Sequence, residues 1–226
     1  MTVVLNALRD IFTPTNSRYL FIGLVYTLTV SVVTVGVSTV FGTILALLRN
    51  YEKRIFGKIA SVYIEVFRNT PLLLWIMICL FVMRFGTTFF RGTLGLTLYT
   101  SSVVAEIVRG GLNSIDKGQF EAASSQGFGK IMTFVYIVLP QCFIRIIPSL
   151  MSQIVTTIKD TSFLSGYAIA EMFYRSKVLL SKLPSQGATI TGAHTLVTYG
   201  SVALIYFCVN FLLSCAVRYM MKRHHA

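Results

Sequence analysis

The amino-acid sequence predicts an all-α membrane protein whose residues 1–226 form one domain with five transmembrane helices. Of the 226 residues, 54% are hydrophobic and only 12% are charged, whereas soluble domains carry about 25% charged residues. Several apolar runs reach the ~20 residues that a helix needs to cross a bilayer. The formal charge of +12 does not require a nucleic-acid partner, and we expect none, because Lys and Arg also flank membrane spans and contact lipid head groups. The five spans are expected at about 20–48, 59–83, 93–112, 134–158 and 195–217.

Residues 1–18 are expected to form an interfacial helix, because they are too short and too polar to span. One helical face of this stretch is apolar and consists of Val4, Leu8, Ile11 and Phe12. Arg9 and Asp10 interrupt the apolar residues, which argues against a secretory signal, and Pro14 should stop the helix.

The first span, 20–48, is uncharged and carries small or hydroxyl side chains on one face. These residues are Thr27, Ser31, Thr34 and Ser38, followed by Gly42 and Ala46. Such faces let helix backbones approach closely in membranes, so we favour a packing role for this face.

The link 49–58 is basic, with Arg49, Lys53, Arg54 and Lys58 against a single acid, so it is expected in the cytoplasm. Pro71 lies inside the second span, 59–83, and should kink or break it. Two acids are each followed three residues later by arginine, and we expect them to pair within their own helices, Glu65 with Arg68 and Glu106 with Arg109. Gly110 and Gly111 should end the third span, 93–112.

Residues 113–133 form a polar, helix-prone segment between two apolar ones. Within it, Glu121-Ala122-Ala123 is followed at fixed spacing by Gly127 and then by Ile-x-Leu-Pro ending at Pro140. We expect Glu121 to lie in the first turn of a short helix, where an acid suits the positive end of the helix dipole. Gly127 is expected to end that helix with a positive φ.

The fourth span, 134–158, has one polar helical face, opposite an apolar face. The polar face consists of Ser149, Ser152, Gln153, Thr156, Thr157 and Asp160, and Arg145 lies on the same stripe. Two interpretations stay open, polar contacts between helices or the lining of a translocation path. A mostly polar connection, 159–194, then leads to the fifth span and a basic tail. An odd number of spans places the two termini on opposite sides, and the basic link 49–58 and the basic tail indicate that the N-terminus is outside and the C-terminus in the cytoplasm.

No GxxxxGK[ST] phosphate-binding loop is present, because Gly129-Lys130 lacks both the upstream glycine and the following hydroxyl. The four cysteines form no Cys-x-x-Cys pair and have no histidine nearby, so we expect buried small residues rather than ligands. We therefore expect no catalytic residue, no metal and no cofactor.

Four blocks of the chain resemble the polar amino acid family of type I ABC importer permeases, whose members are bacterial inner-membrane proteins. They are residues 66–72 (VFRNTPL), 105–111 (AEIVRGG), 121–141 and 159–162 (KDTS). The resemblance implies that Glu121, Ala122, Ala123 and Gly127 belong to a cytoplasmic coupling helix that docks on an ATPase dimer. It also implies a second permease subunit, an extracytoplasmic amino acid-binding protein and alternating access, with ATP hydrolysed by the partner chain. Residues 175–194 have no counterpart in this pattern.

For the substrate, Asp160 could bind an ammonium group, flanked by Gln153, Thr156 and Thr157, while Arg68 or Arg145 could bind a carboxylate. Glutamate, glutamine, aspartate and basic amino acids all suit these groups, and Asp160 could instead be structural. Two further functions stay open, an ion-coupled secondary transporter, although no internal repeat is visible, and a channel or scaffold subunit.

Overall fold

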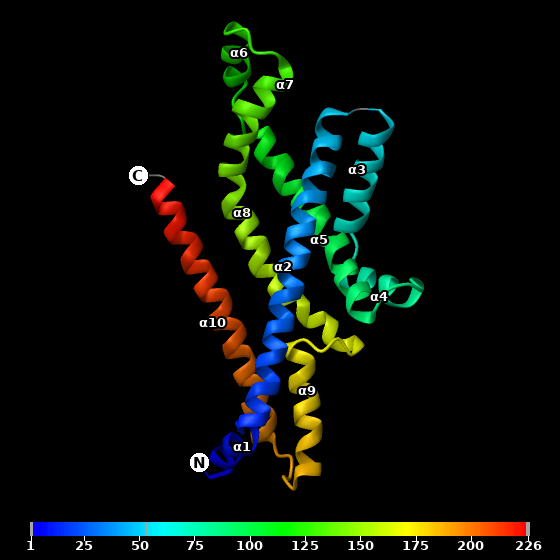
Figure 1. Cartoon of the computed structure of the whole chain (residues 1–226), viewed down its shortest axis with the longest axis vertical. Helices are drawn as coiled ribbons and strands as arrows, with labels where there is room; N and C mark the ends of the chain where they lie inside the picture. The colour runs from blue at the N-terminus through cyan, green and yellow to red at the C-terminus, as the bar shows by residue number, and fades with distance from the viewer. Residues whose placement is uncertain (1, 53, 225–226) are drawn as a thin grey trace.

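The computed structural model describes residues 2–52 and 54–224, and every regular element in those ranges is helical. Lys53 of the predicted basic link lies outside them. Figure 1 shows an elongated bundle around α2, with α6 and α7 at one end and α1 and α9 at the other.

α1 (Thr2–Ile11) and α2 (Pro14–Tyr51) meet at a tight corner. Pro14 ends the first helix as predicted and also begins the second, because its fixed φ suits a first helical position. Thr13 caps α2 by accepting a hydrogen bond from the Asn16 amide at 3.2 Å. Of the predicted apolar face of α1, Ile11 is buried, while Val4, Leu8 and Phe12 stay exposed, as suits an interfacial helix.

The polar face of α2 packs against α5 (Thr88–Asn113), which confirms its predicted packing role. Its four hydroxyl residues are at most 3% exposed. Ser38 donates a hydrogen bond to the Thr97 carbonyl at 3.0 Å, and a Cβ on Gly42 would lie 2.7 Å from the Ser101 carbonyl oxygen. The two backbones are therefore too close for any larger residue at position 42.

Helices occupy most of the predicted basic link, and two helices form the predicted second span. α2 continues to Tyr51 and α3 (Ile55–Arg68) begins at residue 55, so both helices extend into the link predicted at 49–58. α3 and α4 (Leu72–Val82) then meet at 105°. The predicted break at Pro71 is confirmed, because proline cannot continue the backbone hydrogen bonds of the preceding helix, and the residues predicted as one span, 59–83, lie in two helices.

Three stretches of the described chain are helical, long and apolar enough to cross a membrane, namely Pro14–Tyr51, Lys130–Tyr167 and Gly192–Tyr219. The bent pair α3 and α4 adds a fourth candidate if it counts as one span. α5 coincides with the predicted third span, but it is not among these apolar candidates. It also continues past Gly110 and Gly111 to Asn113, which corrects the predicted end.

Gly111 has a packing role within α5. A Cβ there would lie 2.9 Å from the Cys142 sulfur, so the glycine lets α5 and α8 (Leu139–Asp160) approach. Cys79 and Cys142 are buried as expected, whereas Cys208 is exposed and Cys215 is intermediate.

The predicted polar connection 159–194 contains a helix, α9 (Met172–Lys182), between the short turns Thr161–Tyr167 and Leu183–Gln186. The cause is a capping residue, Glu171, which is 0% exposed. Its carboxylate accepts bonds from the Tyr174 amide at 2.6 Å and the Phe173 amide at 2.8 Å. It also accepts one from the Tyr206 hydroxyl at 3.1 Å, which joins α9 to α10 (Gly192–His224).

Candidate functional site

The predicted docking segment is a short exposed helix, α6 (Lys117–Ser125), at the end of the molecule opposite α1 and α9 (Figure 1). Asp116 caps it and accepts a hydrogen bond from the Gly118 amide at 2.7 Å. Glu121 is therefore the fifth residue of the helix, and its predicted position in the first turn is wrong. Asp116 instead supplies the negative charge that stabilises the helix start.

Gly127 ends this helix with φ +81°, as predicted. The Phe128 amide donates to the Ala123 carbonyl at 3.0 Å, and the Gly127 amide donates to the Ser124 carbonyl at 3.0 Å. These two bonds form a Schellman motif, which places the residue after the cap in the left-handed region. No atom lies within 4 Å of a Cβ added at Gly127, so the requirement for glycine comes from the backbone conformation alone.

The three residues of the Glu-Ala-Ala motif differ in solvent exposure. Ala123 is 2% exposed and faces the protein, whereas Glu121 and Ala122 are exposed. The helix is tied to α8 by a bond from the Gln141 amide group to Gln119 Oε1 at 3.1 Å. The segment therefore presents Glu121 and Ala122 outward on a helix that is anchored to a long membrane helix.

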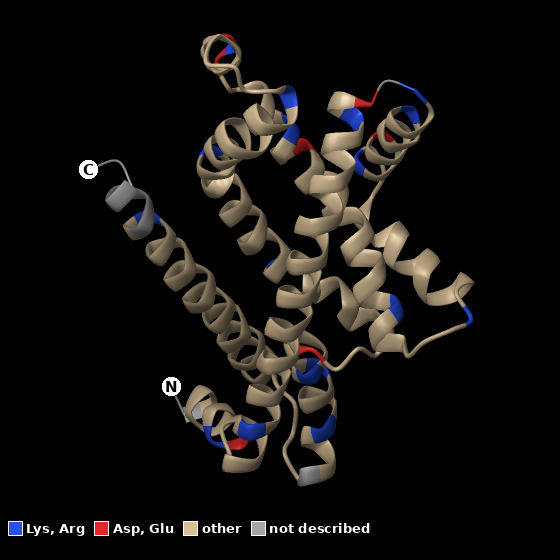
Figure 2. Cartoon of the chain, turned by 45° about the horizontal axis from the view of Figure 1, so that its top comes forward, with Lys and Arg blue, Asp and Glu red and all other residues tan. Residues whose placement is uncertain are grey.

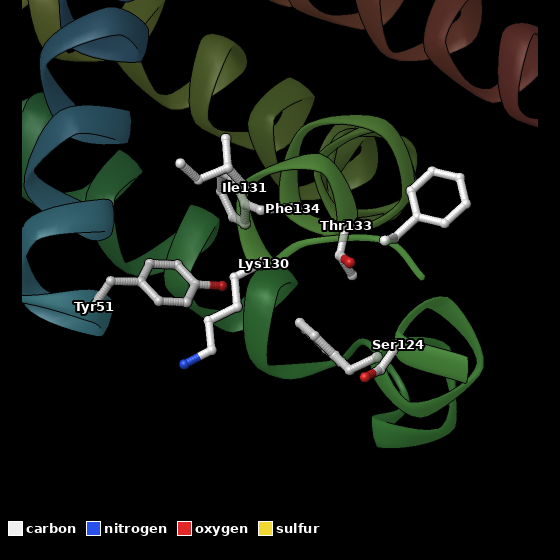
Figure 3. Close-up of a pocket in the computed structure, with 8 residues that line it drawn as sticks. Tyr51, Ser124, Lys130, Ile131, Thr133 and Phe134 are labelled. Carbon is white, nitrogen blue, oxygen red and sulfur yellow. The ribbon is translucent and has the colours of Figure 1, made fainter. Parts of the chain in front are cut away.

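A mostly apolar pocket of about 560 Å³ lies beside this helix (Figure 3). Its lining comes from the end of α2, from α6 and from the following turn, and consists of Tyr51, Phe120, Ser124, Phe128, Lys130, Ile131, Thr133 and Phe134. Figure 3 shows Tyr51 pointing from α2 toward Lys130 at the start of α7 (Lys130–Thr133). The docking end is thus hollowed between α2 and the segment that returns to the membrane.

That returning segment is one long helix with an irregular turn. α7 leads through a π-helical turn, Phe134–Val138, into α8. Pro140 follows the turn directly, and its ring would meet the carbonyl of residue 136 in a regular α-helix, so the wider turn relieves the clash. α7 and α8 are therefore nearly continuous, and the glycine turn at Gly127 separates them from α6.

Five charged side chains form an ion-pair network that joins α2, α3 and α5 near the docking end. Arg49 contacts Glu65 at 2.6 Å and Glu106 at 2.7 Å. Glu106 also pairs with Arg109 at 2.8 Å, as predicted, and with Arg68 at 3.3 Å. The predicted pair between Glu65 and Arg68 is replaced by contacts to other helices, because Glu65 pairs with Arg49 of α2 and Arg68 pairs with Glu106 of α5.

The polar face of α8 is open along most of its length. Ser149, Ser152 and Thr156 are exposed, Gln153 and Asp160 are half-buried, and Thr157 is buried. A cavity of about 470 Å³ between α8 and α10 includes Ser152 and Arg218 in its lining. Within the described part of the chain, the Asp160 carboxylate makes no hydrogen bond or ion pair. A carboxylate that is half-buried and lacks a partner is costly, which favours a partner outside this chain.

The two arginines proposed for a carboxylate lie far from Asp160. Arg145 donates to the Ser114 carbonyl at the end of α5, and it lies ~22 Å from Asp160 along α8. Arg68 belongs to the ion-pair network. The structure therefore does not join either arginine to Asp160 in one compact site.

Several contacts that the sequence did not indicate lie at the end of the molecule opposite α6. His194, which is 4% exposed, lies 3.2 Å from Asp10 and joins α1 to α10. Glu171 joins α9 to α10 as described above. The amide of Met172 also donates to the Thr27 hydroxyl at 3.2 Å, so the N-terminus of α9 is fixed to α2 as well.

Comparison with known proteins agrees with this architecture. The family model for the inner membrane component of binding-protein-dependent transport systems matches residues 38–224. The chain is 33% identical over 210 residues to "Probable glutamine ABC transporter permease protein GlnP" of Bacillus subtilis (strain 168), covering 91% of this chain and 93% of the relative. It is 32% identical over 227 residues to "L-cystine transport system permease protein TcyL" of the same organism, covering 94% and 88%.

Two solved structures have the same fold. An amino acid ABC transporter with histidines matches with a TM-score of 0.81 and 26% identity, covering 92% of this chain and 95% of that one. The inward-facing MetNI methionine ABC transporter matches with a TM-score of 0.75 and 16% identity, covering 94% and 99%, and supports the fold alone. The family model and the curated relatives cover most of the chain, so this protein belongs to the family of binding-protein-dependent transport system inner membrane components.

Proposed function

We propose that this chain is the membrane-spanning permease subunit of an ATP-driven importer for a polar amino acid. The observation that carries the proposal is the docking helix α6, which holds Glu121 and Ala122 outward and ends in the glycine turn at Gly127. The named substrates of the relatives, glutamine and cystine, support an amino acid as the cargo. Glutamate, glutamine, aspartate and basic amino acids stay candidates.

The subunit works with three kinds of partner, an ATPase dimer, a second permease subunit and an extracytoplasmic binding protein. α5 completes five spans, so the termini lie on opposite sides of a bacterial inner membrane. The basic link near residue 54 and the docking helix lie on the cytoplasmic side, which places the C-terminus in the cytoplasm and the N-terminus outside. The exposed polar face of α8 supports a second permease subunit, because polar side chains are costly against lipid and favourable against a partner or a water-filled path.

Coupling follows from how α6 is attached. The ATPase contacts Glu121 and Ala122, while Ala123 packs inward and Gly127 sets the direction in which the chain returns. Closure of the ATPase dimer moves α6. The bonds from Gln141 to Gln119 and from Arg145 to Ser114 pass that movement to α8 and α5. ATP is bound and hydrolysed by the partner chain, and this subunit contributes the motion.

The translocation path follows the polar face of α8. Asp160 receives the ammonium group of the amino acid at the far end, where Gln153, Thr156 and Thr157 offer amide and hydroxyl groups. Arg145 and Arg68 stay proposals for the carboxylate on the part of the path nearer the docking helix, since both lie close to that end.

The test is uptake by proteoliposomes that contain the purified permease with its ATPase. Uptake of a radiolabelled amino acid should require ATP on the ATPase side and a solute-binding protein on the other side. Uptake that needs only a proton or sodium gradient would identify a secondary transporter instead. Passive flux without either energy source would identify a channel.

A further inference from the structure

The end of the molecule opposite α6 is basic. The segments 1–20 and 168–195 contain five Lys or Arg residues and only two acids. Figure 2 shows basic residues on α1, at the start of α2 and on α9. Positive charge on this side is unexpected, because the positive-inside rule concentrates Lys and Arg in short cytoplasmic loops.

Both acids at this end already have partners within the chain. Glu171 is 0% exposed and accepts four hydrogen bonds. Asp10 lies 3.2 Å from His194 Nε2. Neither acid forms an ion pair with a Lys or Arg among the described residues, so the basic side chains around them are not neutralised by close contact.

The five cations divide into two groups. Arg175 lies 4.5 Å from the Tyr19 ring centre and donates to the Ala170 carbonyl at 2.9 Å, while Lys177 bonds to Ser165 at 3.0 Å. These two stabilise the fold. Arg9, Arg18 and Lys182 are exposed and make no ion pair with any described residue. These three form what we call the cationic end surface.

The three residues belong to elements that pack on one another. Ala7, Ile11 and Leu20 form one apolar cluster with Leu179 and Leu183, which holds α1, the start of α2 and the end of α9 together. Lys182 Nζ lies 5.8 Å from the ring of Tyr19, the neighbour of Arg18. The residues of the cationic end surface therefore lie on elements that this apolar cluster holds together.

A lipid surface explains this arrangement less well than a soluble partner does. Lys182 ends α9, which lies outside the apolar stretches Lys130–Tyr167 and Gly192–Tyr219 and reaches the same end of the molecule as α1, away from α6 (Figure 1). Polybasic segments that bind anionic lipid are a feature of cytoplasmic membrane faces. On the side opposite the docking helix, we therefore favour an acidic soluble protein over a lipid surface as the partner of these three cations.

We propose that the cationic end surface, Arg9, Arg18 and Lys182, docks an acidic face of the solute-binding protein. This inference rests on the proposed function and adds the surface and the sign of its charge. Exposed charges at the rim of an interface act mainly on the association rate and its salt dependence, so they guide the binding protein to the permease and orient it.

The experiment uses the permease–ATPase complex in nanodiscs of zwitterionic lipid. Its ATPase rate is measured against the concentration of the solute-binding protein that copurifies with the native complex, loaded in turn with L-glutamine, L-glutamate, L-aspartate and L-arginine, and the amino acid that gives the largest response is used throughout. For the double variant Arg18→Glu with Lys182→Glu, the half-maximal concentration should rise about tenfold or more, with an unchanged maximal rate. The wild-type value should rise steeply with salt, and the variant's value should rise less.

Arg84→Glu is the matched control. Arg84 is exposed on the turn between α4 and α5, and α4 projects sideways, away from α1 and α9 (Figure 1). It should leave the half-maximal concentration unchanged. An equal shift for Arg84→Glu would show a general charge effect and overturn the surface.

Three other results decide the matter. No shift in the double variant would overturn the inference while leaving the importer intact. A shift that appears only with anionic lipid would assign the surface to the membrane. If wild-type ATPase responds to no binding protein, the proposed function itself fails. The milder variant Arg18→Gln with Lys182→Gln should move the value in the same direction by less, which keeps the test valid if charge reversal prevents assembly.

Discussion

Asp160 is the residue on which the substrate proposal depends, and its surroundings permit a clear test. It ends the polar face of α8, is half-buried, and has no partner in the described chain. A charge-assisted hydrogen bond contributes about 1.5–3 kcal/mol. Asp160→Asn keeps the size and removes the charge, so the apparent affinity for transport should weaken about tenfold or more.

Assembly and thermal stability of the same Asp160→Asn complex serve as the control. A substrate role predicts that both stay near wild type while transport affinity falls. The opposite pattern, lower assembly with unchanged affinity in the surviving complex, would make Asp160 a structural residue that contacts a neighbouring subunit.

Arg49 should matter more for stability than Arg68. Arg49 is 23% exposed and bridges two acids at 2.6 and 2.7 Å, whereas Arg68 is 42% exposed and reaches one acid at 3.3 Å. Removing Arg49 leaves Glu106, which is 14% exposed, with fewer cations around a partly buried charge. Arg49→Gln should therefore lower the thermal midpoint of the purified protein more than Arg68→Gln does. Equal midpoints would mean that the network is fully solvated.

These residues also mark a limit of sequence reasoning. The spacing of Glu106 and Arg109 predicted their pair correctly, because neighbours three apart share a helix face. The same spacing failed for Glu65, because its partner Arg49 comes from another helix. A contact between helices depends on how they pack, and one sequence does not contain that information.

At the scale of single elements, the glycine turn after α6 allows the effect of backbone strain to be tested without a steric clash. Gly127 has φ +81° and Gly129 has φ −71°, and no atom lies within 4 Å of an added Cβ at either position. Valine at 127 must adopt a left-handed conformation, which costs about 1–2 kcal/mol, while valine at 129 stays in an ordinary extended region. Gly127→Val should thus reduce ATPase stimulation by the binding protein, and Gly129→Val should not.

Membrane insertion should survive in both glycine variants, because neither position lies in an apolar core. The measurement is the stimulated ATPase rate of each purified complex at equal permease content. Normal stimulation in Gly127→Val would remove the glycine turn from the coupling mechanism.

Element boundaries were predictable where a local rule acts. Pro14, Pro71 and Gly127 each stop a helix for reasons that involve only the adjacent backbone. α9 was missed because its stability comes from Glu171, whose bonds reach residues on α2 and α10. The start of α6 was misplaced because Asp116, five residues before the recognised motif begins at Glu121, caps the helix.

At the scale of the whole molecule, one chain leaves the polar face of α8 open and α5 less apolar than the other long helices. Both features suit a subunit whose interior is completed by a partner, since polar faces within a bilayer require one. Asp160, which has no hydrogen bond or ion pair with any described residue, lies on that same face.

Orientation gives the last prediction, because charge alone does not decide it. The link near residue 54 is basic, yet the opposite end also carries Arg9, Arg18 and Lys182, which make no ion pair with any described residue. If those three residues dock a soluble protein, their positive charge serves that docking and does not mark a cytoplasmic loop. The docking helix then places residue 54 in the cytoplasm.

In a chain whose native cysteines are replaced by alanine, Ser181→Cys should react with an impermeant maleimide on intact spheroplasts. Arg54→Cys should react only after permeabilisation, since α6 and the α2–α3 turn lie at the same end (Figure 1). Labelling of position 54 but not 181 in intact spheroplasts would invert the topology and would place the cationic end surface in the cytoplasm, where no solute-binding protein could reach it.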